Sequence, residues 1–544
     1  MKIKVSPQKQ LTLAILAIIS NLGLSNAANA AAAEFNASNG ILTINGINVP
    51  ASPSKPVYLG ADLKLVKFSQ PFEFELLTTK STSLNSGVAH FDATFNKAFI
   101  PAVQLGADTF YAELELIPGS NPLRFRVNNL HNTKFSSCPS FAIAAGDNAC
   151  KLQGTITQNV TLSNDITWVL GGGVFIGEDN AKSTTLTIEP GTRIVGQSGA
   201  DFLYVRRGSK INAIGTAEQP IIFTGSTDGT DRNIGPGAWG GLVLAGNAPV
   251  NGCNTTVAVC EQFDEALTTS YGGSDANDNS GVLKYAQIRY AGFQVRPDQE
   301  LNALTLLGVG AGTTLDFIEV YRGSDDGIEM FGGTAQFKHL VSYGNSDDSV
   351  DWGAGWKGKA QYVLIKQIAD DGDNGIEADN NEVDNNSLPR AQPLLANFTV
   401  LGSGTTVGAN GALLRRGTGA NIYNSIFAGF AKTCLNIDTN ATFSNAGSIG
   451  NFSGNLTINN SLVNCTKNFD DVTTEPFLVS AWFNGHLGNT TATGSQNTYL
   501  LPNANIPATG PAIKQDNFIE PNNYIGAFLD RNDNWTLGWT IGVN

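Results

Sequence analysis

The chain has 544 residues, with 47 acidic against 33 basic side chains and a formal net charge of −14 at pH 7. This excess of negative charge disfavours nucleic acid and anionic membrane surfaces as partners. Glycine supplies 60 residues and methionine only 2, a composition typical of turn-rich β structure and not of helical bundles. The length suffices for one long repetitive domain together with a smaller one.

Residues 1–30 have the features of an export signal. The start is basic, the apolar run at 11–19 is too short to span a membrane, and Ala28-Asn29-Ala30 is an acceptable cleavage site. No later apolar run is long enough for a transmembrane helix. We therefore expect a secreted protein, periplasmic or on the outer cell surface, with no transmembrane segment.

The six cysteines fall into three local pairs. An even number of cysteines in an exported chain indicates disulfides, although six cysteines allow 15 connectivities. The simplest prediction is local pairing of Cys138 with Cys150, Cys253 with Cys260, and Cys434 with Cys465.

Residues 31–136 are expected to form a separate antiparallel β domain. Apolar and polar residues alternate over 63–66 and 110–117, as in half-buried antiparallel strands. The motif Leu-Gly-Ala-Asp occurs at 59–62 and again at 105–108, which predicts a small sandwich of two similar halves. Such a domain is either a packing or adaptor module or a ligand-binding module.

Strand-like segments then recur roughly every 20 residues, which is typical of a solenoid. We expect a linker at 137–151, a parallel β-helix at 152–470 and a capping region at 471–544, so that the fold class is all-β. Four insertions interrupt the predicted coils, and loops on a rigid scaffold often carry function. They lie at 226–238, 251–281, 292–300 and 379–393.

One sequence pattern occurs twice, at 315–333 and 337–355. The copies are 22 residues apart without a gap, so that Asp326 corresponds to Asp348 and Glu329 to Asp351, and a looser third copy follows at 370–377. Stacked coils pair like parallel strands about 4.8 Å apart, so equivalent side chains lie above one another. Two carboxylates at that distance repel by roughly 3 kcal/mol at an effective dielectric constant of about 20.

Three arrangements relieve this repulsion: solvated or backbone-bonded turns, a shared proton, or a bound cation. Ligands that are all oxygen favour Ca²⁺ over a transition metal. If a cation is bound, the expected ligands are Asp325, Asp326, Glu329, Asp347, Asp348, Asp351, Asp371 and Glu377.

Several segments resemble a known group of proteins. They are 187–192 (TIEPGT), 208–216, 239–249, 278–292, the paired SDD coils, 524–528 and 534–540. Together they resemble secreted bacterial proteins with a right-handed parallel β-helix, the pectate-lyase-like fold. The resemblance runs from about residue 150 to the end of the chain. It implies this fold and export, but little chemistry, because such proteins mostly have no assigned activity.

These features predict an exported extracellular or cell-surface protein that binds a polysaccharide or surface matrix and has acidic turns stabilised by Ca²⁺. The alternative is a polysaccharide lyase or glycoside hydrolase that acts at the 325–377 face. Its candidate catalytic residues are Asp326, Asp348, Asp351 and Arg322. The Gly-His-Gly and Arg-Ile-Lys motifs of polygalacturonase-type hydrolases are absent from the sequence.

Aromatic residues near the acidic pattern are candidate sugar-binding groups. Tyr321, Trp352 and Trp356 would either stack on sugar rings or stack on one another in the wall of the solenoid.

Overall fold

The computed structural model describes residues 32–543 apart from short gaps. The gaps are 53–54, 67–72, 83–88, 93–95, 106–107, 133–137, 147, 230, 232, 254–258, 265–268, 297–298, 406–407, 493–505, 514–515 and 531. The expected export signal at 1–30 lies outside the described residues. Within the described part of the chain, no helix has both the length and the apolar character needed to cross a membrane.

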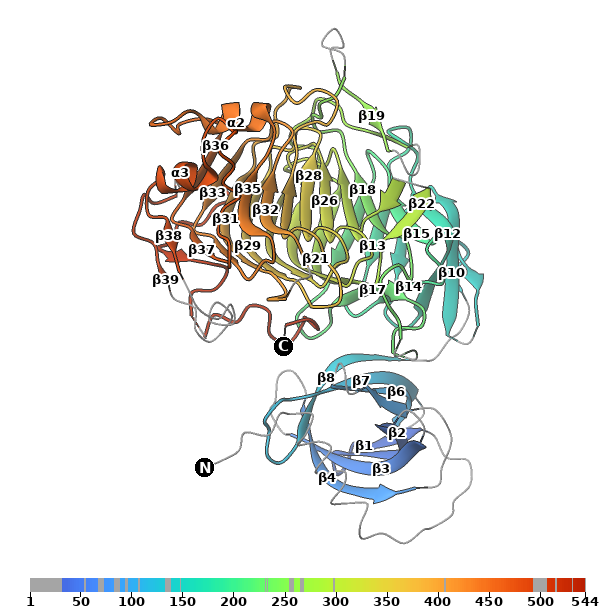
Figure 1. The fold of residues 1–544 in the computed structure, drawn as a ribbon. Helices are drawn as coiled ribbons and strands as arrows, with labels where there is room; N and C mark the ends of the chain where they lie inside the picture. The colour runs from blue at the N-terminus through green and yellow to red at the C-terminus, as the bar shows by residue number, and fades with distance from the viewer. Residues whose placement is uncertain are drawn as a thin grey trace, which may run out of the picture.

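The chain forms a small antiparallel barrel and a long parallel β-helix (Figure 1). The fold class predicted from the sequence is thus confirmed. The strands of the barrel are β1 (Ala33–Asn36), β2 (Ile41–Ser52), β3 (Lys55–Leu65), β4 (Glu73–Ser81), β5 (Ala89–Asp92), β6 (Lys97–Leu105), β7 (Asp108–Leu116) and β8 (Arg124–Asn132).

The barrel differs from the predicted sandwich, because one eight-stranded sheet closes on itself. Its strand order is β1-β2-β3-β4-β8-β7-β6-β5, and the parallel pairs β1–β6 and β2–β5 close it. The two halves are alike, as expected, but not through the repeated motif. Residues 59–62 lie within β3, whereas Leu105 is the last residue of β6 and Asp108 the first of β7.

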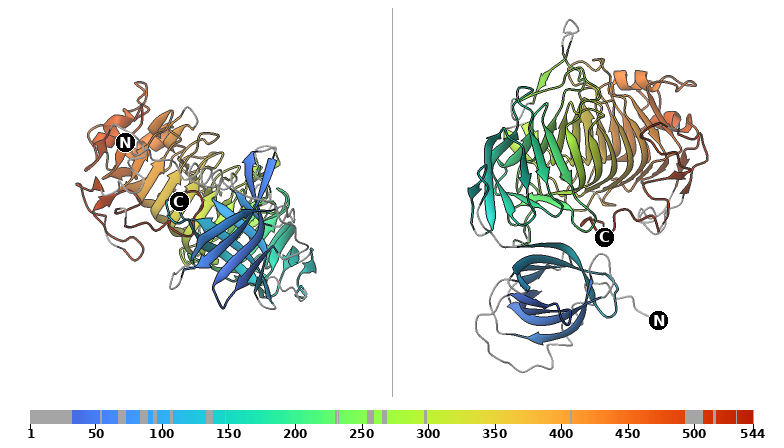
Figure 2. Two further views of the ribbon diagram at one scale, coloured as in Figure 1. Left: turned by 90° about the horizontal axis from the view of Figure 1, so that it is seen from below. Right: turned by 180° about the vertical axis from the view of Figure 1, so that it is seen from behind.

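The strand pairings divide the coils of the β-helix into three faces, and Figure 2 shows the stacked strands from two further sides. Long strands bend across two of them: β21 (Gly281–Arg289), β25 (Thr314–Tyr321), β27 (Gln336–Tyr343), β29 (Lys359–Lys366) and β31 (Leu394–Leu401). Shorter strands on these two faces are β11 (Val160–Leu162), β13 (Thr185–Ile188), β14 (Arg193–Gly196), β16 (Lys210–Ile214), β17 (Ile221–Gly225), β33 (Ala420–Tyr423), β34 (Ile426–Ala428), β36 (Leu456–Asn459), β37 (Leu462–Asn464) and β38 (Thr490–Thr491).

The third face carries the candidate site. Its strands are β15 (Phe202–Val205), β18 (Gly241–Ala245), β24 (Leu304–Leu307), β26 (Ile328–Phe331), β28 (Val350–Gly353), β30 (Ile376–Ala378), β32 (Asn410–Leu414) and β35 (Thr433–Ile437). The solenoid begins with β9 (Ile143–Ala144), β10 (Ala149–Ile156) and β12 (Thr167–Ile176). Three separate two-stranded antiparallel sheets are β19 (Gln262–Phe263) with β20 (Ser270–Tyr271), β22 (Phe293–Arg296) with β23 (Gln299–Leu301), and β39 (Ile506–Pro507) with β40 (Tyr524–Ile525).

Side chains stack from coil to coil inside and outside this framework. A continuous apolar core runs from Cys150 to Phe483. At the bends of the long strands, Tyr285, Phe317 and His339 have positive φ angles, and their rings stack at 4.4 and 4.2 Å between centroids. His339 is therefore part of a stacking ladder and lies outside the acidic face.

The C-terminal part of the chain covers both the last coils and one side of the solenoid. The helix α3 (Val479–Asn484) follows α2 (Asn440–Ala446), and both pack on the last coils. The chain beyond 513 instead returns along the side of the solenoid, as the red end of the ribbon shows in Figure 1. There Trp535 and Trp539 pack on the stacked rings, and Glu319 accepts the backbone N–H groups of Ile541 and Gly542.

The barrel contacts the solenoid through buried charges. Arg193 of the solenoid lies 3.8 Å from Glu113 of the barrel and 3.3 Å from Asp228. Arg289 pairs with the same Asp228 at 2.9 Å. Both guanidinium groups thus face Asp228, and they lower the pKa of this carboxyl although its burial acts in the opposite direction.

Candidate functional site: an acidic cleft

The turns before β26 and β28 hold Asp326 and Asp348 in a buried ladder. The side chains are 5% and 4% exposed. Asp326 Oδ1 accepts the backbone N–H of Asp348 at 3.0 Å, and Asp348 Oδ1 accepts that of Asn374 at 2.6 Å. The strand register places Asn302 one coil before them and Asn410 one coil after Asn374. The two aspartates therefore occupy a position that asparagine fills in the neighbouring coils.

A second row of carboxylates projects outward from the strands. Glu329, Asp351 and Glu377 lie in register on β26, β28 and β30, while their neighbours in sequence point into the core. The predicted 22-residue register between Glu329 and Asp351 is thus confirmed. Asp351 Oδ1 is buried, and the described residues offer it no hydrogen-bond partner.

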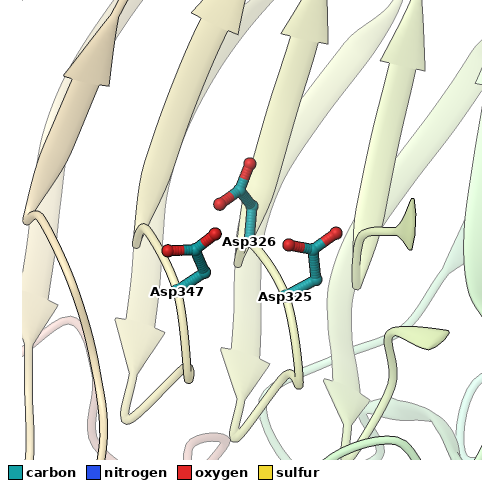
Figure 3. Close-up of side chains that lie close together, drawn as sticks. All are labelled: Asp325, Asp326 and Asp347. Carbon is teal, nitrogen blue, oxygen red and sulfur yellow. The ribbon is translucent and has the colours of Figure 1, made fainter. Parts of the chain in front are cut away.

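Four groups of three carboxylates have oxygens within 4.8 Å of one another. They are Asp325, Asp326 and Asp347; Asp326, Glu329 and Asp351; Asp347, Asp348 and Asp373; and Asp348, Asp351 and Glu377. Figure 3 shows the first group, which lies at the turns of two successive coils. The third and fourth groups repeat the first and second one coil further along.

Burial and mutual repulsion raise the pKa values in this cluster. The pKa of Asp326 is raised well above its usual range by burial and by Asp351. Burial and the neighbouring Glu377 do the same to Asp348 and Asp351. Burial raises the pKa of Glu377 to about 7, although Arg415 acts in the opposite direction. Without a counter-charge, these groups resist ionisation at neutral pH.

The outward row forms the floor of a cleft of about 330 Å³. Three of the predicted insertions supply its walls: Phe263, Asp264 and Tyr271 come from 251–281, Glu300 from 292–300, and Asp379, Asn381 and Glu382 from 379–393. The disulfide Cys253–Cys260 closes the loop just before Phe263. All three predicted disulfides are present, the others being Cys138–Cys150 and Cys434–Cys465.

Arg415 and Arg416 close one end of the cleft, and sequence reasoning missed them. Arg415 pairs with Glu377 and lies 3.0 Å from Asp379. Arg416 pairs with Asp379 at 2.8 Å and with Glu382 at 3.1 Å. Their position follows from the pairing of β30 with β32, which a long insertion separates in the sequence.

The structure places two of the predicted residues away from the cleft. Arg322 pairs with Asp370 at 2.8 Å and is not among the residues that line the cleft. Asp371 is exposed and belongs to none of the four groups of carboxylates. The register of Val350 with Ile376 makes Asp373 the equivalent of Asp347, because the third turn is longer than the first two.

The prediction of sugar-binding rings at Tyr321, Trp352 and Trp356 is also corrected. Trp352 and Trp356 are fully buried, and their indole N–H groups bond to Thr418 and to the carbonyl of Ala335. Tyr321 is 7% exposed and stacks on Tyr343 at 5.4 Å. These rings build the wall of the solenoid, which was the alternative interpretation.

Comparison with known proteins gives one family. The model of the pectate-lyase-like β-helix domain matches residues 154–540. A search of curated proteins finds no significant match. Among solved structures, tailspike protein 2 of the Escherichia coli O157:H7 bacteriophage CAB120 matches with 9% identity and a TM-score of 0.23. The match covers 90% of this chain and 62% of the tailspike chain, and so loose a superposition says nothing about function.

Proposed function

The chain belongs to the pectate-lyase-like β-helix family, and we propose that it is an exported protein that binds a neutral glycan at the acidic cleft, with Ca²⁺ held by the carboxylates. The observation that carries this proposal is the row of Glu329, Asp351 and Glu377, stacked from consecutive coils on the floor of the cleft. The three disulfides fit an oxidising compartment outside the cytoplasm.

The donor set fits Ca²⁺. All the donors are carboxylate oxygens, which hard divalent cations prefer. Asp351 belongs to two of the four groups, one with Asp326 and Glu329 and one with Asp348 and Glu377. The buried Oδ1 of Asp351, which has no hydrogen-bond partner among the described residues, could coordinate a cation there. A cation also supplies the counter-charge whose absence raises the pKa values of these groups.

The charge of the cleft favours a neutral glycan over a polyuronate. Nine acidic residues line it, against Arg415 and Arg416. Both arginines are already paired with carboxylates of the cleft. The acidic residues of the cleft would therefore repel the carboxylate of a uronate. The same balance disfavours a lyase, because neither arginine is free to act as the base that removes a proton from a uronate.

Phe263 is the aromatic residue best placed to contact a sugar ring. It is 70% exposed at the rim of the cleft, next to a disulfide-closed loop. Tyr271 and Phe331 line the same end, with their ring centroids 6.4 Å apart. Clefts that bind small molecules combine such apolar surfaces with a few polar groups that fix orientation.

The test is binding of the full chain to immobilised neutral, amino-substituted and uronate polysaccharides, each with Ca²⁺ and with chelator. We expect Ca²⁺-dependent retention on a neutral polysaccharide. Glu329→Gln with Asp351→Asn should abolish it, and Phe263→Ala should weaken it severalfold. The control is Asp371→Asn, an acidic residue of the same region outside the four groups. Retention that is equal in chelator, or unaffected by the double variant, would refute the proposal.

A glycoside hydrolase is the second candidate. It is favoured by the proximity of Asp351 and Glu377, whose oxygens lie within 4.8 Å, and by the pKa of Glu377 of about 7, which suits a general acid. Retaining enzymes place two carboxyl groups about 5–5.5 Å apart. Release of reducing sugar from the retained polysaccharide, lost in Glu377→Gln, would favour this candidate over pure binding.

A further inference from the structure

One end of the barrel holds an apolar cavity of about 180 Å³ that is partly open to the surface, far from the acidic cleft in sequence and in fold. Only apolar side chains line it: Phe35, Leu42, Leu65, Phe74, Val103, Leu105, Phe110, Ala112, Leu114 and Val127. They come from seven of the eight strands, all but β5, and all of them except Leu105 belong to the apolar core of the barrel.

The barrel has two equivalent halves, and a comparison of them shows that the cavity occurs at only one end. Ala33 pairs with Val103 as Ala89 pairs with Ile47, so that β1–β4 and β5–β8 are equivalent halves. In this correspondence Phe35 is equivalent to Phe91, since they face Leu42 and Ala98 at the same place in the two halves.

Equivalent residues at the two ends differ in exposure. Phe91 and Leu116 are each 4% exposed and belong to the closed core. Their counterparts Phe35 and Leu65 are only half-buried and line the cavity. One end of the barrel is thus packed shut, whereas the other end opens onto an apolar space among the described residues.

The chemistry of the lining defines the ligand. With no polar side chain on its wall, the cavity offers nothing to a sugar, an ion or water. An eight-stranded barrel is just wide enough to be filled by side chains or to hold one small ligand. An engineered cavity of about 150 Å³ in another protein, lined by similar apolar side chains, remains dry and binds benzene.

We propose that the barrel binds an uncharged apolar molecule, or the apolar group of a larger one, of about the size of one aromatic ring. Such a molecule loses its contact with water and gains dispersion contacts with the ten lining side chains. This activity is independent of the cleft, so its failure would leave the proposal for the cleft untouched.

The experiment measures binding of benzene, and of glucose as a polar ring of similar size, to the full chain by ligand-observed NMR. We expect saturable binding of benzene and none of glucose. Ala112→Leu places three further carbon atoms in the cavity and should weaken benzene binding at least tenfold. The matched control is Ala61→Leu, at the equivalent position of the other half, which should change binding less than twofold.

Val103→Phe fills the cavity from a different strand and keeps the test valid if Ala112→Leu does not fold. Absence of benzene binding up to its solubility in water would overturn the proposal, because the cavity would then be filled by the chain itself. Binding that persists unchanged in a folded Ala112→Leu or Val103→Phe variant would overturn it as well.

Discussion

Replacing both buried aspartates by asparagine separates a structural role of the acidic ladder from a role in cation binding. Asn302, Asn374 and Asn410 occupy the same position in neighbouring coils, so the chain itself shows that asparagine fits there. Asn374 Oδ1 accepts the backbone N–H of Asn410 at 3.2 Å, as the two aspartates do for the residues that follow them. Asp326→Asn with Asp348→Asn therefore keeps the backbone bonds.

Without a cation, this double variant should be more stable than the natural chain. Two like charges about 5 Å apart repel by roughly 3 kcal/mol at an effective dielectric constant of about 20. The raised pKa values of Asp326 and Asp348 mean that partial protonation already removes some of this repulsion at pH 7. In addition, Asn302 Oδ1 has no partner among the described residues, and an amide at position 326 can donate to it, which adds about 1 kcal/mol. We expect a gain of about 1–3 kcal/mol in chelator.

With Ca²⁺ the order should reverse. A ligand that binds only the folded state stabilises it by about 4.1 kcal/mol at a thousandfold excess over its dissociation constant, which exceeds the difference expected in chelator. The natural chain should gain this amount, and the double variant, which lacks two ligands, should gain little. The assay is urea unfolding followed by tryptophan fluorescence, in Ca²⁺ and in chelator, with Asp371→Asn as control.

Two results would refute this reasoning. A double variant that is less stable than the natural chain in chelator would show that the carboxylates are needed for the turns themselves. An equal response to Ca²⁺ in both proteins would place the cation elsewhere.

Three further predictions concern the same cleft. In chelator, the free energy of unfolding should fall as pH rises from 4.5 to about 7, because folded Glu377 keeps a proton that the unfolded chain has lost. Glu377 alone should account for roughly 3 kcal/mol of this fall, at 1.36 kcal/mol per pKa unit, and the raised pKa values of Asp326, Asp348 and Asp351 add to it. In a pH series of urea unfolding, Glu377→Gln should therefore reduce the slope by the share of Glu377. Arg415→Gln should move the upper end of that pH window higher, since Arg415 lowers the pKa of Glu377, and an unchanged window would show that the ion pair does not form. Phe263→Ala should weaken glycan retention without changing the unfolding midpoint, because the ring is 70% exposed; a lower midpoint would assign it a packing role.

The sequence predicted the parts of the site that follow a strict repeat. Residues 315–355 hold one register without a gap, so the stacking of Glu329 on Asp351 could be deduced from spacing alone. Asp371 was misplaced because the next turn is longer, and only the pairing of β28 with β30 shows that Asp373 is the equivalent residue. Arg415 was missed for the same reason, since its coil contains the long insertion at 379–393.

Contacts between distant segments explain the remaining differences. The barrel closes through the pairs β1–β6 and β2–β5, which join residues far apart in the sequence and leave no local pattern. Trp352 lies on a strand where alternate residues point inward, yet the sequence alone did not show which alternation faces the core. Phe263 became a candidate only when its insertion was seen to border the cleft.

The identity of the ladder residues is the strongest reason to assign a ligand to this face. Solvated turns would leave Asp326 and Asp348 exposed, but both are nearly buried. A structural ladder needs only an acceptor for the next backbone N–H, and asparagine provides it without charge at 302, 374 and 410. Aspartate at this position adds repulsion with the row of Glu329, Asp351 and Glu377. The turn itself does not require that charge, and the proposed cation, held by the aspartates together with the outward row, would account for it.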